Sequence, residues 1–589
     1  MNLVESAKAQ IDELIFDAYT KALAAGKLPE IGQKQSDNGE KQPEPGEKKQ
    51  PDNGLLVGSV EIPRETSHGD YAATHAMAAA KELKLAPRMI AEALTEHIGL
   101  DGSYFKSFSI AGPGFLNFVL SEKWYGEVLQ AAEVMGDNYG AVNIGDGKRV
   151  MVEFVSANPT GPMTIGNARG GVLGDTLASI LEKAGYDVWR EFLVNDAGNQ
   201  VMLFGKSIDA RYMQLCLGAD NYEFPDDGYH GDDIKELAEM IFKTEGSKLQ
   251  ELPENERIDK FTAFALPYNI ALMKEHLERY RIRFDEWFYE STLHDSGYIT
   301  ETIELLEKRG LLYESDGALW LRNMTLGADK DEVLRKSNGY YTYYAVDIAY
   351  HRNKLTRGFD RAIDIWGADH HGHVIRLKTT LRSPELGKAL GMDGDKLDLI
   401  IMQMVRILRD GETIKVSKRT GRALTLNDLL DEISVDACRF FFNAKPDSHL
   451  DFDLGLAVRQ DSENPVYYVQ YAHARICSLI AMLAADGFDV PSYSEIDTGL
   501  LDGEPELELI KQISFLPEEI KLAARDCDPS RINKYVTELA ARFHKFYGAC
   551  RIKGEERALL LARLKLADTV RAVIKNCLDI LGVTAPEKM

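Results

Sequence analysis

Two short stretches of this 589-residue chain combine the residue types that chemistry on a phosphate group needs. The first, NPTGPMTIGNARGG, runs from Asn158 to Gly171 and is rich in glycine and proline. The second, KVSKRTGR, runs from Lys415 to Arg422 and concentrates cationic side chains. Backbone N–H groups at a glycine-rich turn bind anions, and a cationic loop stabilises a polyphosphate whose charge moves during reaction. A tightly packed turn and a solvated basic loop are the plain structural alternatives.

The residues around the first stretch predict a strand, a turn and a helix in that order. RVMVEFVS, which ends at Ser156, is short and apolar and therefore predicts a buried strand. We expect a helix to start from Asn167, with Asn167 as its N-cap, and to end at Gly185. This order places a helix N-terminus at the carboxyl end of a strand, where the helix dipole attracts an anion.

A second apolar strand, AIDIWGAD, is followed directly by HHGH at residues 370–373. Two such strand-to-turn units separated by a long helical insertion predict the two halves of a doubly wound parallel sheet. Ligands of such sheets bind outside the carboxyl ends of the strands, where residues 158–166 and 369–373 would meet. Because no cysteine or second histidine cluster accompanies HHGH, contact with a ligand or simple hydrogen bonding is favoured over zinc binding, and we expect no protein-caged metal.

The sequence predicts an α/β protein that consists of several domains. We expect a small α+β domain over residues 1–120, a Rossmann-type domain with a helical insertion over 121–395, a basic-loop region over 396–455 and an all-α domain over 456–589. Residues 32–54 contain no large apolar side chain and predict a mobile insertion.

Charge and cysteine content limit the classes of protein to which the chain can belong. The six cysteines include no C-x-x-C pair, which fits a reducing compartment. No apolar run approaches the ~20 residues of a membrane span, so we expect a cytoplasmic protein without a membrane partner. The net charge of −24 neither indicates nor excludes binding to nucleic acid, because such binding depends on a local basic surface.

Outside residues 32–54, the whole chain resembles the bacterial-type arginyl-tRNA synthetases, which are class I enzymes. The first class I signature, HIGH, corresponds to Thr164 to Asn167, and the second, KMSKS, to Lys415 to Arg419. SANPTGP, NDAGNQ, DIAYH, WGADHHGH, SIAGPGFLNFVL and the closing LDILGVTAPEKM resemble this family more than class I enzymes in general. The resemblance implies that ATP and L-arginine form arginyl-adenylate, that the arginyl group passes to the 3′ end of its tRNA, and that the first step requires bound tRNA. It also implies that Mg²⁺ accompanies ATP and that the protein is a monomer.

Matching positions assign residues to four roles. The catalytic positions are Thr164, Asn167, Lys415, Ser417 and Lys418. ATP would contact Gly161, Pro162, Gly166, Gly367, Asp369, Lys415 and Lys418. Glu153 and Asn158 would hold the α-amino end of arginine, Tyr343 and Asp347 its guanidinium, and His370 would lie close by. The Gly58 to Leu120 domain would contact the tRNA elbow and the C-terminal helices the anticodon, through Tyr467, Tyr471, Arg475, Arg542, Lys545 and Tyr547.

The first signature departs from the family because Thr164 and Asn167 replace both of its histidines. A hydroxyl and an amide still donate hydrogen bonds but carry no charge, and losing one preorganised donor costs about 3 to 4 kcal/mol of barrier. We expect an active enzyme in which Asn167 serves as cap and phosphate donor, because Lys415 and Lys418 are retained. The alternatives are a catalytically impaired paralogue that binds tRNA or arginine, and a class I ligase for another amino acid. The second is disfavoured because a carboxylate such as Asp347 suits a guanidinium.

Overall fold

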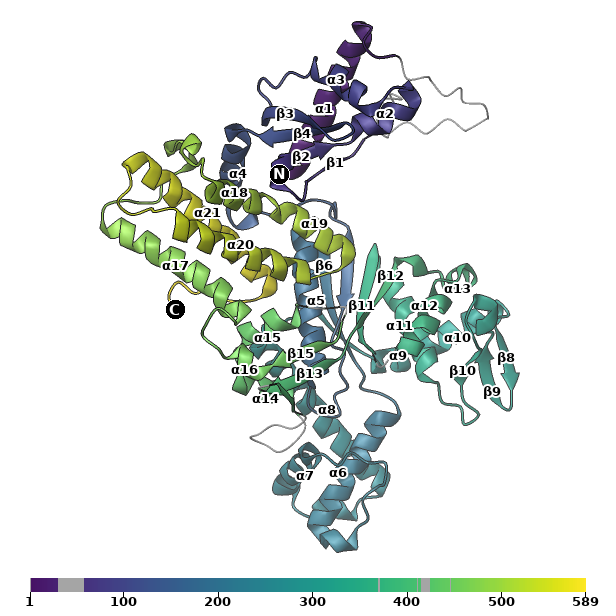
Figure 1. The fold of residues 1–589 in the computed structure, drawn as a ribbon. Helices are drawn as coiled ribbons and strands as arrows, with labels where there is room; N and C mark the ends of the chain where they lie inside the picture. Colours follow the sequence, from purple (N-terminus) through teal and green to yellow (C-terminus); the bar gives the residue numbers. More distant parts are fainter. Residues whose placement is uncertain are drawn as a thin grey trace.

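The computed structural model describes residues 2–29, 58–368, 371–409, 411–414, 424–444, 446 and 448–589. A five-stranded parallel sheet lies at the centre of this described chain, with strand order β12-β11-β5-β6-β7 (Figure 1). Its strands are β5 (Arg149–Glu153), β6 (Asp187–Val194), β7 (Glu286–Tyr289), β11 (Arg361–Gly367) and β12 (Leu397–Met402). The chain order reverses between β5 and β11, which confirms the predicted doubly wound sheet and places its ligand crevice at their carboxyl ends.

Helix α5 (Ile165–Lys183) follows β5 and packs closely on it. A Cβ atom on Gly174 would lie 2.1 Å from the ring of Phe154, and one on Gly171 would lie 2.7 Å from Ile282. These glycines therefore let the helix approach the end of β5. The predicted N-cap was wrong, because α5 begins at Ile165 and its N-cap is Thr164, whose extended backbone and side-chain oxygen meet the cap geometry.

Two insertions extend the sheet domain. The first follows β6 and consists of α6 (Asn199–Leu217), α7 (Asp232–Glu245) and α8 (Glu254–Arg279), which enclose a core of their own. The second follows β7 and lies to the right of the sheet in Figure 1, whereas α6 and α7 lie below it. It contains α9 (Ser291–Asp295), α10 (Tyr298–Lys308), the antiparallel strands β8 (Leu312–Ser315), β9 (Ala318–Leu321) and β10 (Glu332–Arg335), and α11 (Tyr343–Thr356). Helices α12 (His371–Leu381) and α13 (Pro384–Leu390) then join β11 to β12.

The N-terminal part combines helices with an antiparallel sheet of order β1-β2-β4-β3. Its elements are α1 (Leu3–Ala24), β1 (Val60–Glu61), β2 (Tyr71–Ala73), α2 (His75–Leu83), α3 (Pro87–Thr95), β3 (Phe105–Ala111) and β4 (Phe115–Leu120). Helix α4 (Glu122–Met135) leads from this part towards the central sheet and contacts the C-terminal helices α18 (Glu504–Ser514) and α21 (Arg557–Leu581).

The C-terminal part is helical, as predicted, and packs on the sheet domain through α5. A small sheet of order β14-β13-β15 precedes it, formed by β13 (Val405–Arg409), β14 (Glu412–Thr413) and β15 (Leu450–Asp453). The helices are α14 (Leu426–Glu432), α15 (Val435–Phe442), α16 (Leu454–Ala457), α17 (Pro465–Ala485), α18 (Glu504–Ser514), α19 (Leu516–Asp526), α20 (Ser530–Ala549) and α21 (Arg557–Leu581). In the residues that the structure describes, no helix is long and apolar enough to cross a bilayer.

Candidate active site

The turn between β5 and α5 places Thr164 and Asn167 together at the helix N-terminus. They form a reciprocal cap, in which the Asn167 backbone N–H donates to Thr164 Oγ1 at 3.3 Å and the Thr164 backbone N–H donates to Asn167 Oδ1 at 2.9 Å. The Thr164 hydroxyl also donates to Asn167 Oδ1 at 2.8 Å. The amide oxygen of Asn167 is thus occupied within the cap, whereas its amide NH₂ group makes no hydrogen bond with the described residues and is left to donate elsewhere.

The glycines of this turn leave space above the helix N-terminus. Gly166 is exposed, and a Cβ atom there would approach only Thr164 Oγ1, at 3.5 Å, among the described residues. Gly161 is similarly open, since its Cβ would lie 3.8 Å from Asp233, and Pro162 is exposed. Across the crevice, Gly367 ends β11. The structure therefore gathers these predicted nucleotide contacts at one edge of the sheet.

Five of the predicted site residues lie outside the described residues. They are Asp369, His370, Lys415, Ser417 and Lys418. The predicted 32–54 insertion also lies outside them. Their assignments stay predictions from the resemblance.

Helix α11 presents Tyr343 and Asp347 at its N-terminal end, one turn apart. Thr342 caps the helix by accepting a hydrogen bond from the Ala345 backbone N–H. Tyr343 is 58% exposed, whereas the Asp347 side chain is 25% exposed and its Oδ2 lies 2.7 Å from His373 Nε2. Asp347 therefore does not face bulk water freely, and a partner on α12 orients it.

A buried carboxylate that the sequence did not single out lies beside Asp347. Glu290 is 6% exposed, and burial raises its pKa to about 7, with further increases from the nearby charges of Asp347 and Asp196. Glu290 in turn helps to raise the pKa of Tyr343, after burial. Glu290 and Asp347 thus form an acidic group near Tyr343, with Glu290 Oε1 3.4 Å from His294 Nε2, and such a group favours a cation with several N–H donors. The only sequence signal for Glu290 was an acid directly after the apolar strand β7.

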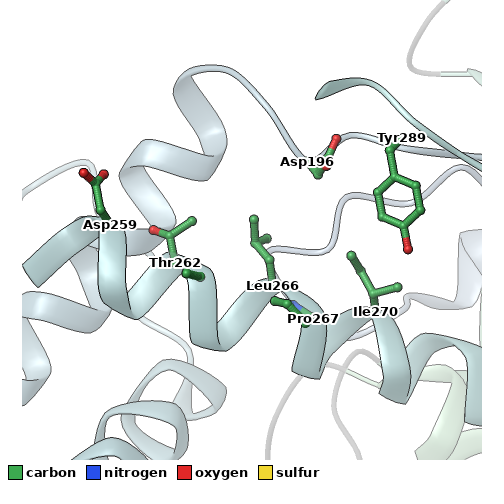
Figure 2. A pocket seen from close by; sticks show the side chains of 8 residues that line it. Asp196, Asp259, Thr262, Leu266, Pro267, Ile270 and Tyr289 are labelled. Atoms are coloured by element: carbon green, nitrogen blue, oxygen red, sulfur yellow. The ribbon is translucent and has the colours of Figure 1, made fainter. Parts of the chain in front are cut away.

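A pocket of about 340 Å³ opens beside this acidic group, between α8 and the ends of β6 and β7. Figure 2 shows Tyr289 from the sheet edge facing the apolar side chains of α8 across it, with Asp196 beside Tyr289. Its lining residues are Asp196, Asp259, Thr262, Ala263, Leu266, Pro267, Ile270 and Tyr289. Apolar walls with carboxylates at the ends suit a ligand that has an alkyl or ring body and a cationic or amino group.

Asn158 projects from the turn after β5 and lies within a chain of amides. Its Nδ2 donates to Gln200 Oε1 at 2.6 Å, and its Oδ1 accepts a hydrogen bond from Asn195 Nδ2 at 2.8 Å. Asn158 is exposed, so a ligand in the crevice can reach it. Asn195 and Gln200, which belong to the NDAGNQ segment, thus hold the side chain of the predicted site residue Asn158.

Glu153 lies below the surface of the crevice, in a row of three buried carboxylates. It is 2% exposed and pairs in register with Glu191 on β6 and with Asp364 on β11, both 0% exposed. Its Oε1 accepts a hydrogen bond from Ser156 Oγ at 2.8 Å, and its Oε2 contacts the Tyr350 hydroxyl at 2.8 Å. A direct contact between Glu153 and arginine would require part of this network to open.

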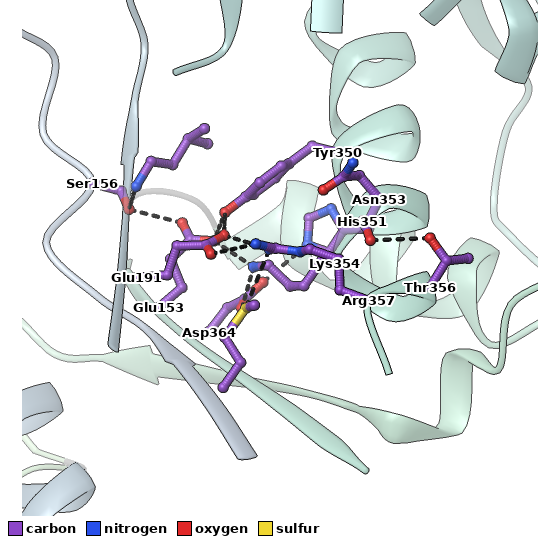
Figure 3. Close-up of polar contacts among 12 residues, drawn as sticks. Glu153, Ser156, Glu191, Tyr350, His351, Asn353, Lys354, Thr356, Arg357 and Asp364 are labelled. Carbon is purple, nitrogen blue, oxygen red and sulfur yellow. Dashed lines mark hydrogen bonds and ion pairs between the residues drawn. The ribbon is translucent and has the colours of Figure 1, made fainter. Parts of the chain in front are cut away.

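Cations and donors from α11 and its C-cap residue neutralise the row (Figure 3). The buried Lys354 ammonium group contacts Glu153 and lies 2.7 Å from Asp364 Oδ1. Arg357 binds Glu191 through two hydrogen bonds of 2.7 Å. Burial raises the pKa of Glu153, whereas Lys354 and then His351 overcome the effect of burial and lower that of Asp364. Sequence reasoning missed this network, although each acid follows or interrupts an apolar strand.

The C-terminal candidates form a continuous aromatic surface on α17 and α20. Tyr467 and Tyr471 stack with centroids 6.1 Å apart, and Tyr471 stacks on His544 at 6.0 Å. Arg475 lies 4.3 Å from the ring centroid of Tyr547. Arg542 and Lys545 instead pair with acids: Arg542 with Glu508 at 2.6 Å and Glu538 at 2.9 Å, and Lys545 with Glu504 at 3.8 Å. The structure brings together the aromatic candidates and Arg475.

Three family patterns match the chain in sequence order. Residues 48–120 match the arginyl tRNA synthetase N terminal domain, residues 129–453 the catalytic domain of class I tRNA synthetases (R), and residues 469–589 the DALR anticodon binding domain. Curated arginine–tRNA ligases of Acetivibrio thermocellus and Ruminiclostridium cellulolyticum are each 48% identical over 590 residues, covering 100% of both chains. The structure of Thermus thermophilus arginyl-tRNA synthetase covers 99% of this chain and 100% of its own, with a TM-score of 0.71 at 20% identity, a likeness of fold.

Proposed function

Because the chain belongs to the arginyl-tRNA synthetase family, we propose that the crevice at the ends of β5 and β11 joins L-arginine to ATP and then to tRNA. The protein is accordingly an ATP-dependent arginine–tRNA ligase. The comparisons give no support to the alternative of a catalytically impaired paralogue.

ATP binds over the turn between β5 and α5 in this proposal. The support is the open turn at Gly161, Pro162 and Gly166 above the N-terminus of a 19-residue helix, whose dipole favours phosphate. The Asn167 amide donates to the α-phosphate as the carboxylate of arginine attacks it and pyrophosphate leaves. Gly367 and Asp369 contact the ribose, and Lys415, Ser417 and Lys418 stabilise the departing pyrophosphate. Mg²⁺ enters the site bound to the ATP phosphates and to water.

Arginine binds with its guanidinium at the N-terminal end of α11. The observation that carries this assignment is the convergence of Asp347, Glu290 and Tyr343, because paired carboxylates select a planar donor fork. His370 lies close to this group by its position in the motif. Asn158 receives the α-amino end, and Glu153 supports that end through its hydrogen bond with Ser156.

The tRNA for arginine contacts both ends of the chain. The aromatic surface of α17 and α20 stacks on unpaired anticodon bases, with Tyr467, Tyr471, Arg475 and Tyr547 as the principal contacts. Arg542 and Lys545 contribute to tRNA binding by exchanging their carboxylate partners for phosphate groups of the tRNA. The N-terminal domain contacts the elbow. We also propose that the protein is a cytoplasmic monomer. Light scattering of the purified protein tests the oligomeric state, and cell fractionation tests the location.

Arginine-dependent pyrophosphate exchange, measured with ATP, Mg²⁺ and tRNA across the twenty amino acids, tests the proposed function. We expect exchange with arginine and none with lysine. An absence of exchange at any arginine concentration, with tRNA still bound, would refute an active enzyme.

A further inference from the structure

The row of three buried carboxylates beneath the crevice brings like charges close together. Glu191, Glu153 and Asp364 occupy directly opposed positions on three adjacent parallel strands, and each is 2% exposed or less. Like charges that face each other across strands repel, and burial removes the water that would screen them. Cations supplied by α11 therefore determine whether these three strand ends can lie side by side.

Lys354 holds the central position among those cations. Its side chain is 0% exposed, and its ammonium group bridges Glu153 on β5 and Asp364 on β11. Burial by itself would lower the pKa of Lys354, but Asp364, Glu153 and Glu191 together raise it, so the group stays charged. The bridge crosses the two strands between which the ligand crevice opens (Figure 3).

On the β5 side, the bridge fixes a strained turn. Val155 and Ser156 have φ angles of +69° and +38°, values that a β-branched residue such as Val155 rarely adopts. The Ser156 hydroxyl donates to Glu153 Oε1 at 2.8 Å and accepts from the Leu193 backbone N–H at 3.2 Å. Glu153 thus anchors the turn that carries Asn158 into the crevice.

On the α11 side, the same bridge fixes the helix that carries Asp347. The His351 ring lies between two acceptor oxygens, with Nε2 at 2.9 Å from Asp364 Oδ2 and Nδ1 at 2.7 Å from the backbone oxygen of Asp347. The Tyr350 hydroxyl lies 2.8 Å from both Glu153 Oε2 and Glu191 Oε1. The turn of α11 that bears Asp347 is therefore attached to the same carboxylates as the strained turn.

We propose that Lys354 is a positioning residue of the arginine site, because its buried bridge between Glu153 and Asp364 sets the distance between Asn158 and Asp347. Lys354 does not touch arginine, and this inference rests on the proposed function of the crevice. A positioning role predicts that the affinity for arginine depends on the bridge and that the affinity for ATP does not. A purely stabilising role predicts no such difference. A misplacement of about 1 Å between substrate-holding groups can cost on the order of a hundredfold in rate.

The principal test removes the bridge without changing the net charge of the network. The full-length variant Lys354→Gln with Asp364→Asn loses one cation and one anion together. Calorimetric titration with arginine, and pyrophosphate exchange with ATP, Mg²⁺ and tRNA, are measured well below the melting temperature of each variant. We expect Kd and KM for arginine to rise about tenfold or more, and KM for ATP to stay within about twofold.

A matched control removes a buried ion pair far from the crevice. Arg439 Nη2 lies 2.5 Å from Asp175 Oδ2, where α15 meets the middle of α5, and Arg439 is 0% exposed. The variant Asp175→Asn with Arg439→Gln is expected to lower Tm and leave KM for arginine unchanged. If the Lys354 variant likewise lowers Tm but keeps wild-type arginine affinity, the proposed positioning role is wrong.

A milder variant decides the question if the double variant does not fold. Tyr350→Phe removes one hydroxyl from the row without changing charge, and we expect a rise of about threefold to tenfold in Kd for arginine. An unchanged Kd in a folded Tyr350→Phe protein overturns the proposal. Wild-type protein measured in parallel separates the two hypotheses, because failure of its arginine-dependent exchange would contradict the proposed function instead.

Discussion

The Nε2 atom of His373 lies 2.7 Å from Oδ2 of Asp347, which joins the first turn of α12 to the helix that carries the predicted guanidinium ligand. The contact uses the last histidine of HHGH, whereas the resemblance assigned His370 to this neighbourhood. Because one carboxylate oxygen is held by His373, the other can be presented to a ligand in a fixed direction. Preorganisation of this kind is what selects a planar guanidinium over a flexible ammonium.

Asp347→Asn is expected to raise KM for arginine by about ten- to a hundredfold, because a hydrogen bond to a charged group contributes about 1.5 to 3 kcal/mol. Steady-state pyrophosphate exchange with varied arginine measures the change. Asp295→Asn, an exposed acid on the adjacent α9, is the matched control and should keep wild-type KM. Equal KM values for both variants would remove Asp347 from the arginine site.

Arginine affinity should fall as the pH drops below 7. Burial, Asp347 and Asp196 raise the pKa of Glu290 from its ordinary value of 4.5 to about 7, so the empty site holds a proton there. A guanidinium favours the ionised carboxylate, and its binding must therefore release that proton. Calorimetry in buffers of different ionisation enthalpy, between pH 6 and 8, measures the release. Glu290→Gln should abolish the pH dependence, and a wild-type Kd that is flat over this range would contradict the assignment.

The same raised pKa has a consequence for stability. The folded protein binds a proton at Glu290 that the unfolded chain releases between pH 4.5 and about 7. The free energy of unfolding contributed by this group therefore decreases as the pH rises through that window. Denaturant unfolding of wild type and Glu290→Gln at pH 5 and pH 8 measures it. We expect Glu290→Gln to gain stability relative to wild type at pH 8, and the opposite order would contradict the buried placement of Glu290.

Asn167→His tests whether the altered first signature limits the rate. The imidazole regains a donor that can carry charge, but the hydrogen bond from the Thr164 backbone N–H to Asn167 Oδ1 is lost. We expect kcat for pyrophosphate exchange to rise, with a loss of about 0.5 to 2 kcal/mol of stability from the weakened cap. Thr164→Ala, which loses the cap without gaining a donor, serves as the comparison. A fall in kcat for Asn167→His would show that the amide is the better donor in this chain.

Tyr471→Ala should weaken tRNA binding through loss of stacking, by about 1 to 3 kcal/mol, while KM for arginine and ATP stays unchanged. Met482→Ala, an exposed residue further along α17, is the control. Filter binding of tRNA at several salt concentrations measures both variants. Because stacking releases no counterions, the salt dependence of log Kd should be the same for Tyr471→Ala and wild type. A changed slope would indicate a phosphate contact instead.

Local patterns in the sequence were sufficient where a single segment carries the information. The apolar run ending at Ser156, the glycine-rich turn and the helix ending near Gly185 predicted the β5–α5 unit, and the second strand predicted its partner β11. The N-cap of α5 was misplaced by three residues because Thr164 and Asn167 both fit a cap, and only the backbone geometry distinguishes them.

The sequence by itself therefore determined the doubly wound sheet, the helical C-terminal part and, through its motifs, the family of the protein. The tertiary structure decided which side chains meet at the site. It brought Glu290 to Asp347, and it aligned Glu191, Glu153 and Asp364 beneath the crevice around Lys354. These groups come from strands and helices far apart in the sequence, with 201 positions between Glu153 and Lys354, and only strand register and burial give such isolated charges a common environment.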